Sequence, residues 1–526
     1  MIIDPQIPNG LPKSWGTVVI DEVAEINPAL PISNLPEDTE VSFLPMKAVE
    51  EESGFFNPAM AKKYVEVRKG YTPFVDGDVI FAKITPCMEN GKAAVVNKLI
   101  NGIGFGSTEF HVMRAEPRAL LPQYLFFFVI QKAFRKEAQA KMTGSAGQKR
   151  VPTTFIQKSP IPIPPLAEQR RIVAKIEELF TKLDAGVASL KAAKKQLKRY
   201  RQSVLKAAVE GELTRAWREK HKEELEPASF LLERILRERR AKWEADQLAK
   251  MQAQGKTPKD GKWKTKYQES AVPETTEFPA LPYGWTWITV EQAASTSPNS
   301  ITDGPFGSNL KTEHYTSEGP RVIRLQNVGD GLFLDARAHI SQTHFERLSK
   351  HRVYPGDLVI AALGEKPPRA CVIPESVGPA IVKADCIRLN SDTSLAMPHY
   401  LNFVLNSEPT RKRTSDVVHG IGRPRLNLGE IKAIVLPLPP LGEQVQIVAE
   451  VERRLSVADE IEATLDAELK RAERLRQSIL KRAFEGKLVP QDPNDEPASA
   501  LLERIKAERS SVRSSAFRRS GRKKTA

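Results

Sequence analysis

Two glycine-containing basic turns occupy matching places in the chain and carry side chains that can contact nucleic acid. Their sequences are GSAGQKR at residues 144–150 and HGIGRPR at residues 419–425. Arginine and lysine bind phosphates and guanine edges, whereas asparagine and glutamine can pair with adenine. A position shared by two otherwise different segments should serve a phosphate contact or the fold, and not the identity of a base.

The same chemistry marks further candidates in the two long segments that contain these turns. We predict nucleic-acid contacts from side chains that can donate to phosphates or base edges. In residues 1–160 they are Lys83, Lys92, Gln148, Lys149 and Arg150, and in residues 273–436 they are Ser308, Asn309, Lys311, Arg324, Gln326, Asn327, Arg423 and Arg425. For each of them an ordinary surface role is an equal alternative.

Motifs for catalysis by the chain itself are missing from the sequence. An adenine methyltransferase needs a loop with Asn or Asp, two prolines and an aromatic residue to hold a flipped base, and the nearest string, NPAM at 57–60, lacks the second proline and the aromatic residue. There is no phosphate-binding GxxxxGK[ST] loop, the eight histidines do not cluster, and the three cysteines lack paired spacing. Asp78 and Asp357 follow glycines in turns that an Asp side chain commonly closes. We therefore predict a non-catalytic chain without a metal or a cofactor.

The overall charge favours a polyanionic partner. Lys and Arg number 79 against 65 Asp and Glu, which leaves a net charge of +14. The N-terminus does not read as a cleavable signal, and no apolar run approaches the ~18 residues needed to span a bilayer. We expect a cytoplasmic protein that does not associate with membranes.

An internal repeat organises all of these features. PPLAEQ at 164–169 returns as PPLGEQ at 439–444, RQS at 201–203 as RQS at 476–478, and EG at 210–211 as EG at 485–486, always with the offset of 441 minus 166, or 275. A gap-free copy of some fifty residues predicts two similar modules. The preceding segments repeat more loosely: a Gly-Asp turn and then a strand follow at 77–80 and 356–359, and proline-led helices begin at Pro122 and Pro398.

Each repeated stretch begins with prolines and continues as a predicted long helix. Residues 161–165 and 436–440 cannot continue a helix, so we expect stiff hinges there. From residue 176, steps of four and three predict a coiled-coil seam in both copies. Its apolar members are Ile176, Phe180, Leu183, Val187, Leu190, Leu197 and Val204 in the first copy, and Val451, Leu455, Leu465, Leu469 and Ile479 in the second. Arg201 and Arg476 interrupt both seams at the same place, where they either extend to solvent or set the register or a partner contact.

Further amphipathic segments are expected from about residues 228 and 498. The basic tracts 239–266 and 509–524 read as a solvated linker and tail, for which phosphate contact is possible but not required.

With these motifs, and with GPFGSNL at 304–310 opening the second domain, the whole chain resembles the DNA-specificity subunit of type I restriction-modification enzymes. The resemblance implies an α+β protein with an internal pseudo-two-fold repeat. Two mixed α/β target recognition domains, 1–160 and 273–436, would be separated by two long antiparallel coiled-coil helices. Residues 161–272 would hold the first hinge, helical region and linker, and 437–526 the second hinge, helical region and basic tail.

The resemblance also implies a function and partners. Each domain would read one half of a split site in double-stranded DNA, while the helices would bind two methyltransferase subunits and the complex would recruit restriction and translocase subunits. S-adenosylmethionine, ATP and Mg would be bound by those partners. Two alternatives stay open: a free-standing DNA-modifying enzyme, and a coiled-coil scaffold that binds only proteins.

Overall fold

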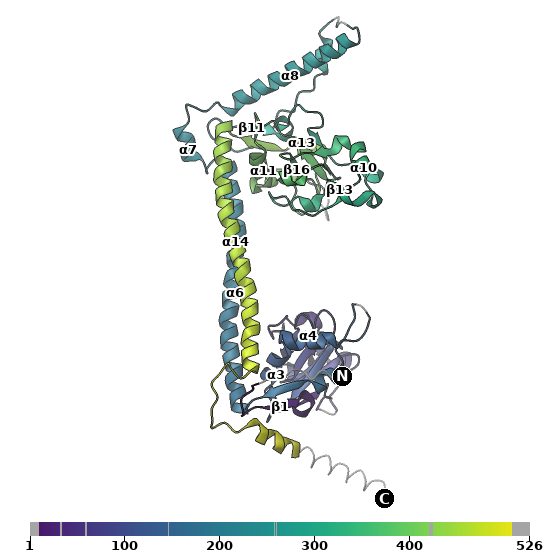
Figure 1. The fold of residues 1–526 in the computed structure, drawn as a ribbon, viewed down its shortest axis with the longest axis vertical. Helices are drawn as coiled ribbons and strands as arrows, with labels where there is room; N and C mark the ends of the chain where they lie inside the picture. The colour runs from purple at the N-terminus through teal and green to yellow at the C-terminus, as the bar shows by residue number, and fades with distance from the viewer. Residues whose placement is uncertain are drawn as a thin grey trace. The chain divides into compact units, whose positions relative to one another are not determined.

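The protein forms two compact units. The computed structural model describes residues 10–31, 34–57, 60–145, 147–256, 258, 260–419 and 424–507 (Figure 1). Unit 1 contains residues 1–191 and 466–526, and unit 2 contains residues 192–465. Each unit therefore combines one of the predicted domains with parts of both long helices.

Among its described residues, the domain of unit 1 contains two four-stranded sheets and one strand pair. The sheets have the orders β2-β9-β6-β7 and β4-β3-β8-β5, and β1 pairs with β10. All neighbours are antiparallel except β3 and β8. The strands are β1 (Gly16–Val19), β2 (Ala24–Ile26), β3 (Glu40–Leu44), β4 (Met60–Lys63), β5 (Thr72–Val75), β6 (Val79–Ala82), β7 (Ala93–Val95), β8 (Ile103–Gly106), β9 (Phe110–Ala115) and β10 (Pro160–Ile163). The helices are α1 (Ile20–Val23), α2 (Tyr64–Val67), α3 (Pro122–Val129), α4 (Lys132–Ala140) and α5 (Thr153–Lys158).

The domain of unit 2 has the same strand orders. They are β12-β19-β16-β17 and β14-β13-β18-β15, with β11 paired to β20; β13 and β18 are parallel, and the other neighbouring strands in the described part of the unit are antiparallel. The strands are β11 (Thr286–Thr289), β12 (Ile301–Thr302), β13 (Tyr315–Ile323), β14 (His339–Ile340), β15 (Arg352–Val353), β16 (Leu358–Ala361), β17 (Arg369–Val372), β18 (Ala380–Val382), β19 (Cys386–Leu389) and β20 (Val435–Leu438). The helices are α9 (Val290–Ala293), α10 (Gln342–Arg347), α11 (Pro398–Asn406), α12 (Glu408–Thr414) and α13 (Leu428–Ala433). This correspondence, strand by strand, matches the repeat seen in the sequence.

The two Gly-Asp turns have the predicted role and an additional partner. Asp78 accepts a hydrogen bond from the Val75 amide at 2.9 Å, and Asp357 accepts one from the Tyr354 amide at 2.8 Å, so each carboxylate closes its own turn. Each also forms an ion pair with an arginine on the neighbouring strand, Arg114 at 2.7 Å or Arg388 at 2.6 Å. The expected helix starts at Pro122 and Pro398 are likewise confirmed.

Residues 161–163 and 436–438 of the proline-rich bridges lie in strands, which corrects the prediction of hinges. β10 pairs along its length with β1, and β20 pairs with β11. Ile161, Ile163, Leu436 and Leu438 are fully buried. Proline is tolerated here because each of these strands belongs to a pair only, and so needs no ladder of hydrogen bonds on its other side. The bridge is therefore part of the domain.

The duplicated Glu-Gln pair attaches each domain to the start of a long helix. Glu168 accepts a hydrogen bond from the indole Nε1 of Trp15 at 3.0 Å, and Glu443 accepts one from Trp285 at 2.8 Å. The neighbouring amide of Gln169 donates to Ala119 O and Pro164 O and accepts from the Leu121 amide. Gln444 makes the corresponding contacts with Leu395, Pro439 and Met397. The motif thus holds the first strand and the loop before α3 or α11.

The two long helices start directly after the proline-rich bridges. α6 (Leu166–Val209) and α14 (Leu441–Phe484) each contain 44 residues and are followed closely by Gly211 and Gly486, whose φ angles of +73° and +68° suit a helix end. Every predicted seam residue is buried or half-buried. In unit 2, α6 and α14 are antiparallel, because Lys194 contacts Glu462 whereas the later Arg201 contacts the earlier Asp459.

The seam arginines form ion pairs between the two helices. Arg201 binds Asp459 at 2.6 Å and Glu462 at 2.9 Å in unit 2. In unit 1, Arg476 forms an ion pair with Asp184 and lies 4.3 Å from the centre of the Phe180 ring. These contacts favour a role in helix register over simple extension to solvent.

The segment after α6 is more ordered than the predicted linker. It forms α7 (Arg215–Lys220) and α8 (Ala228–Ala253), and Ala228, Leu231 and Ile235 are buried in the core of unit 2. Within the basic tract, Arg239 pairs with Asp392 at 3.0 Å, and Trp243 stacks on Trp263. The tract is therefore attached to its unit and is not a free linker. A second segment begins at Ala498 and packs in the core of unit 1, whereas the tail 509–524 lies outside the described residues.

Candidate nucleic-acid interface

In unit 1, the predicted basic turn lies beside the end of β6. The backbone of Arg150 forms one isolated β-bridge with Ile84, which is distant in the sequence, and another with Thr143, which is near. These two bridges fix the turn. The Arg150 guanidinium forms a two-fold contact with the Glu109 carboxylate, with Nη2–Oε1 at 2.7 Å and Nε–Oε2 at 2.9 Å. Glu109 directly precedes β9, which is the neighbour of β6 in the sheet. The turn is thus tied to the centre of the sheet.

This ion pair has an electrostatic consequence for the turn. The hydrogen bond from Arg150 lowers the pKa of Glu109 despite partial burial, and the charges of Arg150 and Lys83 lower it further. Glu109 is therefore ionised at neutral pH and offsets part of the positive charge that Arg150 and Lys83 would present to a phosphate. Lys83 is half-buried and Gln148 and Lys149 are exposed, so three of the predicted residues share this surface with Arg150.

Lys92 is the fifth candidate of this domain. It is half-buried, and its carbonyl oxygen accepts a hydrogen bond from the Ala82 amide at 2.9 Å. Lys92 therefore also lies beside the end of β6, directly before β7 and outside the basic turn.

Unit 2 builds the same arrangement around Arg425. Its backbone bridges to Leu363 and His419, and its Nη2 lies 2.8 Å from Oδ1 of Asp385, which directly precedes β19. The guanidinium also lies 5.9 Å from the centre of the Phe306 ring. Arg425 and Arg150 therefore have the same kind of carboxylate partner at the same place in the sheet. Arg423 lies outside the described residues.

Ser308, Asn309 and Lys311 lie together in the loop that follows β12. All three are exposed, and a single 3-10 turn, Gly307–Asn309, holds the first two. His344 helps to fix this loop, because its ring contacts the carbonyl oxygen of Asn309 at 2.8 Å. Lys311 lies 3.7 Å from Glu313, a solvent-exposed ion pair that a phosphate could replace at small cost.

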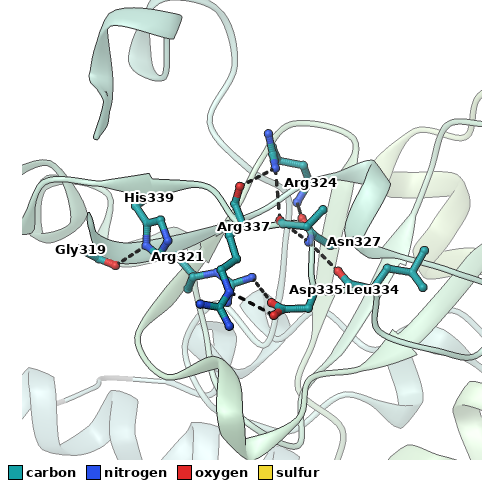
Figure 2. A network of polar contacts seen from close by, with 9 residues as sticks. Gly319, Arg321, Arg324, Asn327, Leu334, Asp335, Arg337 and His339 are labelled. Carbon is teal, nitrogen blue, oxygen red and sulfur yellow. Dashed lines mark hydrogen bonds and ion pairs between the residues drawn. The ribbon is translucent and has the colours of Figure 1, made fainter. Parts of the chain in front are cut away.

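The third group of candidates surrounds a polar network after β13 (Figure 2). Asn327 is completely buried; its Nδ2 donates to the carbonyl oxygens of Leu334 and Ala336 at 2.8 Å, and its Oδ1 accepts from the Arg324 amide. This geometry contradicts the prediction that Asn327 contacts nucleic acid, because the amide has no free edge to offer. Arg324 is half-buried and donates to the carbonyl oxygens of Ala336 and Arg337, whereas Gln326 is exposed.

Charge in this network is partly neutralised by one carboxylate. Asp335 binds Arg321 at 2.7 Å and Arg337 at 3.1 Å, and these hydrogen bonds hold its pKa below the usual range. The guanidinium groups of Arg321, Arg324 and Arg337 all contact other protein groups. The exposed Gln326 is thus the member of this group that is best placed for a direct contact.

Sequence reasoning missed the carboxylates Glu109 and Asp385. Both precede the strand beside the Gly-Asp strand, and their separation, 385 minus 109 or 276, is close to the repeat offset. This spacing could have identified the two carboxylates as corresponding residues from the sequence. Among the described residues no three His, Cys, Asp or Glu side chains lie together as metal ligands would, and no helix is long and apolar enough to cross a bilayer.

Comparison with known proteins decides the family. Residues 12–199 and 345–471, more than half of the chain, match the family described as the type I restriction modification DNA specificity domain. The chain belongs to this family. The match confirms the resemblance noted in the sequence, and it covers the first domain, most of α6, the second half of the second domain and most of α14.

Named relatives can be aligned with most of the chain. The specificity subunit of the type I restriction enzyme EcoAI from Escherichia coli is 29% identical over 511 residues, covering 88% of this chain and 80% of the relative. The EcoEI specificity subunit from the same species is 26% identical, covering 89% and 82%. A chain from a structural study of type I restriction-modification assembly has a TM-score of 0.63 at 20% identity, covering 91% of this chain and all of that one. The last similarity concerns the fold alone.

Proposed function

We propose that this chain is the non-catalytic specificity subunit of a type I restriction-modification complex, and that the domain of each unit reads one half of a split DNA site. The observation that carries the proposal is the repetition of one sheet arrangement with different exposed loops. β6 and β16 occupy corresponding central positions, and each carries a carboxylate-held arginine turn beside it. A shared frame with different loops is suited to reading two different sequences.

Within each domain, we assign different tasks to the shared and the unshared positions. Arg150 and Arg425 occupy matching places and should contact the phosphate backbone, which positions a protein on DNA without reporting its sequence. The exposed side chains without an identical counterpart, such as Gln148 and Gln326, are better suited to base edges. These assignments rest on exposure and hydrogen-bonding capacity.

Chemistry in the complex would belong to partner subunits. We assign S-adenosylmethionine to two methyltransferase subunits, and ATP and Mg to restriction and translocase subunits, since this chain lacks the sequence motifs for binding them. The paired parts of α6 and α14 would supply the frame on which these partners assemble and would set the gap between the two half-sites.

The decisive experiment maps methylated sites in DNA exposed to the complete complex. The sites should form two short sequences at a constant separation. Exchanging residues 1–163 for the corresponding domain of a relative should then change one half and preserve the other; the exchange must include Ile163 so that β1 and β10 come from the same donor. A change in both halves would contradict independent reading.

Two controls separate the alternatives. Methyl transfer or cleavage by the purified chain alone would show a free-standing enzyme. Absence of sequence-dependent DNA affinity with all partners present would indicate a scaffold that binds only proteins. For the proposed subunit, DNA affinity of the complex should instead fall steeply with salt, because bound Lys and Arg release condensed counterions.

A further inference from the structure

A loop of unit 2 carries a phenylalanine at an exposed tip. The loop joins β12 to β13, and residues 306–309 within it are all exposed, whereas residues 304–305 and Leu310 on either side are buried. Phe306 is 46% exposed. Single exposed apolar residues are common on protein surfaces, so the surroundings of Phe306 decide what its ring can do. We call residues 306–309 the tip.

Both ends of the tip are fixed to the domain. Before it, the backbone of Gly304 lies so close to that of Lys383 that a Cβ at position 304 would collide with the Lys383 carbonyl group. After it, the His344 ring contacts the carbonyl oxygen of Asn309 at 2.8 Å, and Leu310 packs in a hydrophobic cluster. The tip therefore holds the phenylalanine in a fixed place, which reduces the entropy lost on binding.

The core of the domain does not account for the aromatic ring. Leu310 belongs to a hydrophobic cluster of unit 2, whereas the nearby Phe306 is exposed. In unit 1, the segment that follows β2 packs its large apolar residue, Leu30, against a hydrophobic cluster of that domain. The two modules thus use this segment differently, and in unit 2 the apolar group is available for a ligand.

The tip belongs to the surface on which the candidate nucleic-acid contacts of unit 2 lie. The Arg425 guanidinium, which we assign to a phosphate, lies 5.9 Å from the centre of the Phe306 ring. Two carboxylates of this surface are already bound by cations, Asp385 by Arg425 at 2.8 Å and Glu313 by Lys311 at 3.7 Å. They do not change what the ring itself prefers, because an uncharged phenyl group gains from apolar surface. Duplex DNA offers such surface between its stacked base pairs.

Insertion between base pairs fits the chemistry of the ring. A phenyl group cannot hydrogen-bond to a base edge, so in an undistorted major groove its specific contact would be with a thymine methyl group. Proteins that bend DNA instead place apolar side chains between base steps and partly unstack them. Partial insertion needs only the outer edge of the ring, which the exposed part of Phe306 supplies. The cationic Arg425 beside it can hold a phosphate next to the distorted step.

We propose that Phe306 is a wedge that inserts between two adjacent base pairs of the half-site bound by unit 2. The ring would offset part of the cost of unstacking that step, while Arg425 binds a phosphate beside it. This inference rests on the proposed function and adds to it a residue that acts on the shape of the DNA instead of on base identity. Because Leu30 is packed within unit 1, the wedge belongs to the half-site of unit 2.

The test titrates the complete complex with a duplex that carries the site it methylates, and follows fluorescence anisotropy. Phe306→Ala should weaken binding by about tenfold. Phe306→Leu keeps an apolar side chain and should retain most of the affinity. Phe230→Ala is the matched control and should bind like the unaltered chain, because Phe230 is a 62% exposed phenylalanine of α8, outside the candidate interface. Thermal unfolding checks the fold of each variant.

A nick in one DNA strand locates the wedge. The nick keeps every base but makes its step easier to unstack. Moved step by step through both half-sites, it should remove most of the Phe306→Ala defect at one step of the unit 2 half-site and at no step of the other. Replacing each thymine by deoxyuridine, which lacks the 5-methyl group, should leave the ratio of the two affinities unchanged.

Equal affinities of Phe306→Ala and the unaltered chain would overturn the proposal, as would a defect that no nick relieves. A thymine replacement that abolishes the difference would assign the ring to a methyl group, and loss of a methyltransferase subunit in native mass spectrometry would assign it to a protein contact. A lower melting temperature of Phe306→Ala would make the ring structural. Each of these results also overturns the wedge. If the unaltered complex bound no DNA sequence selectively, the proposed function itself would be wrong.

Discussion

Arg201 of α6 lies 2.6 Å from Asp459 of α14, and the same two residue types are paired again 275 positions away. Arg476 corresponds to Arg201 and Asp184 to Asp459, and these two form the ion pair of unit 1. Each helix thus supplies the arginine of one pair and the carboxylate of the other. In an antiparallel helix pair, such reciprocal contacts favour one register, because a shift along the helix breaks both.

We expect a measurable coupling between Arg201 and Asp459. In a double-mutant cycle with Arg201→Ala and Asp459→Ala, the coupling in the free energy of unfolding should be about 0.5–1 kcal/mol, since Asp459 is largely exposed and screened. It should fall at high salt. Urea unfolding followed by circular dichroism measures it. Arg471→Ala, which removes an exposed pair within one helix, is the control, and a zero coupling for Arg201 would exclude the register role.

Glu168 should give the stability an unusual dependence on pH. Burial raises its pKa above the ordinary 4.5, although hydrogen bonds from Gln491 and Trp15 act in the opposite direction. Between the ordinary and the raised value, the folded state binds more protons than the unfolded state, so this group lowers the free energy of unfolding as the pH rises through that window. Glu168→Gln keeps an acceptor for Trp15 and should remove this dependence.

Unfolding experiments on the Glu168 variants between pH 4 and pH 8 test this expectation. Glu168→Ala should cost about 1–3 kcal/mol at all pH values, because it leaves the buried indole N–H of Trp15 without its acceptor. Glu109→Gln is the comparison with the opposite sign: the pKa of Glu109 is lowered, so its stabilisation is lost as the pH falls. A steeper fall with rising pH in Glu168→Gln than in the unaltered chain would contradict the assignment.

Arg150 and Arg425 should act as phosphate contacts. Replacing either by Ala should weaken binding of the complex to all DNA sequences alike and lower the slope of log K against log salt by about 1. Arg118→Ala is a matched control in unit 1, since Arg118 also binds a carboxylate, Glu116, but beyond the opposite end of β9. Loss of specificity at a single base pair, without a change in salt slope, would show base reading instead.

The helices should set the gap between half-sites. One heptad inserted after Leu190 and another after Leu465 preserve both seams and lengthen each helix by about 10 Å at ~1.5 Å per residue. At ~34 Å per turn of about ten base pairs, this corresponds to roughly three more base pairs between the halves. The half-sites also rotate by nearly a third of a turn, which weakens binding. Methylation mapping decides the matter, and an unchanged gap in an active complex would exclude the helices as the spacer.

The sequence alone was sufficient for the features that depend on local order. The two long helices, α6 and α14, could be predicted because a helical period repeats every few residues and the duplication supplied a second reading of each position. The Gly-Asp turns followed from side-chain contacts within four residues. The family could be recognised for the same reason, since its motifs are short and their spacing is constant.

Tertiary structure decided which polar side chains remain available. Asn327 was a candidate for nucleic-acid contact, but its amide is used by backbone groups up to nine residues away. Arg150 stays a candidate phosphate contact, but the sequence did not show that Glu109, 41 residues earlier, binds its guanidinium. The proline bridges looked like hinges, but they pair with strands more than a hundred residues before them. Such partners depend on which strands become neighbours, and a strand's own residues do not specify its neighbour.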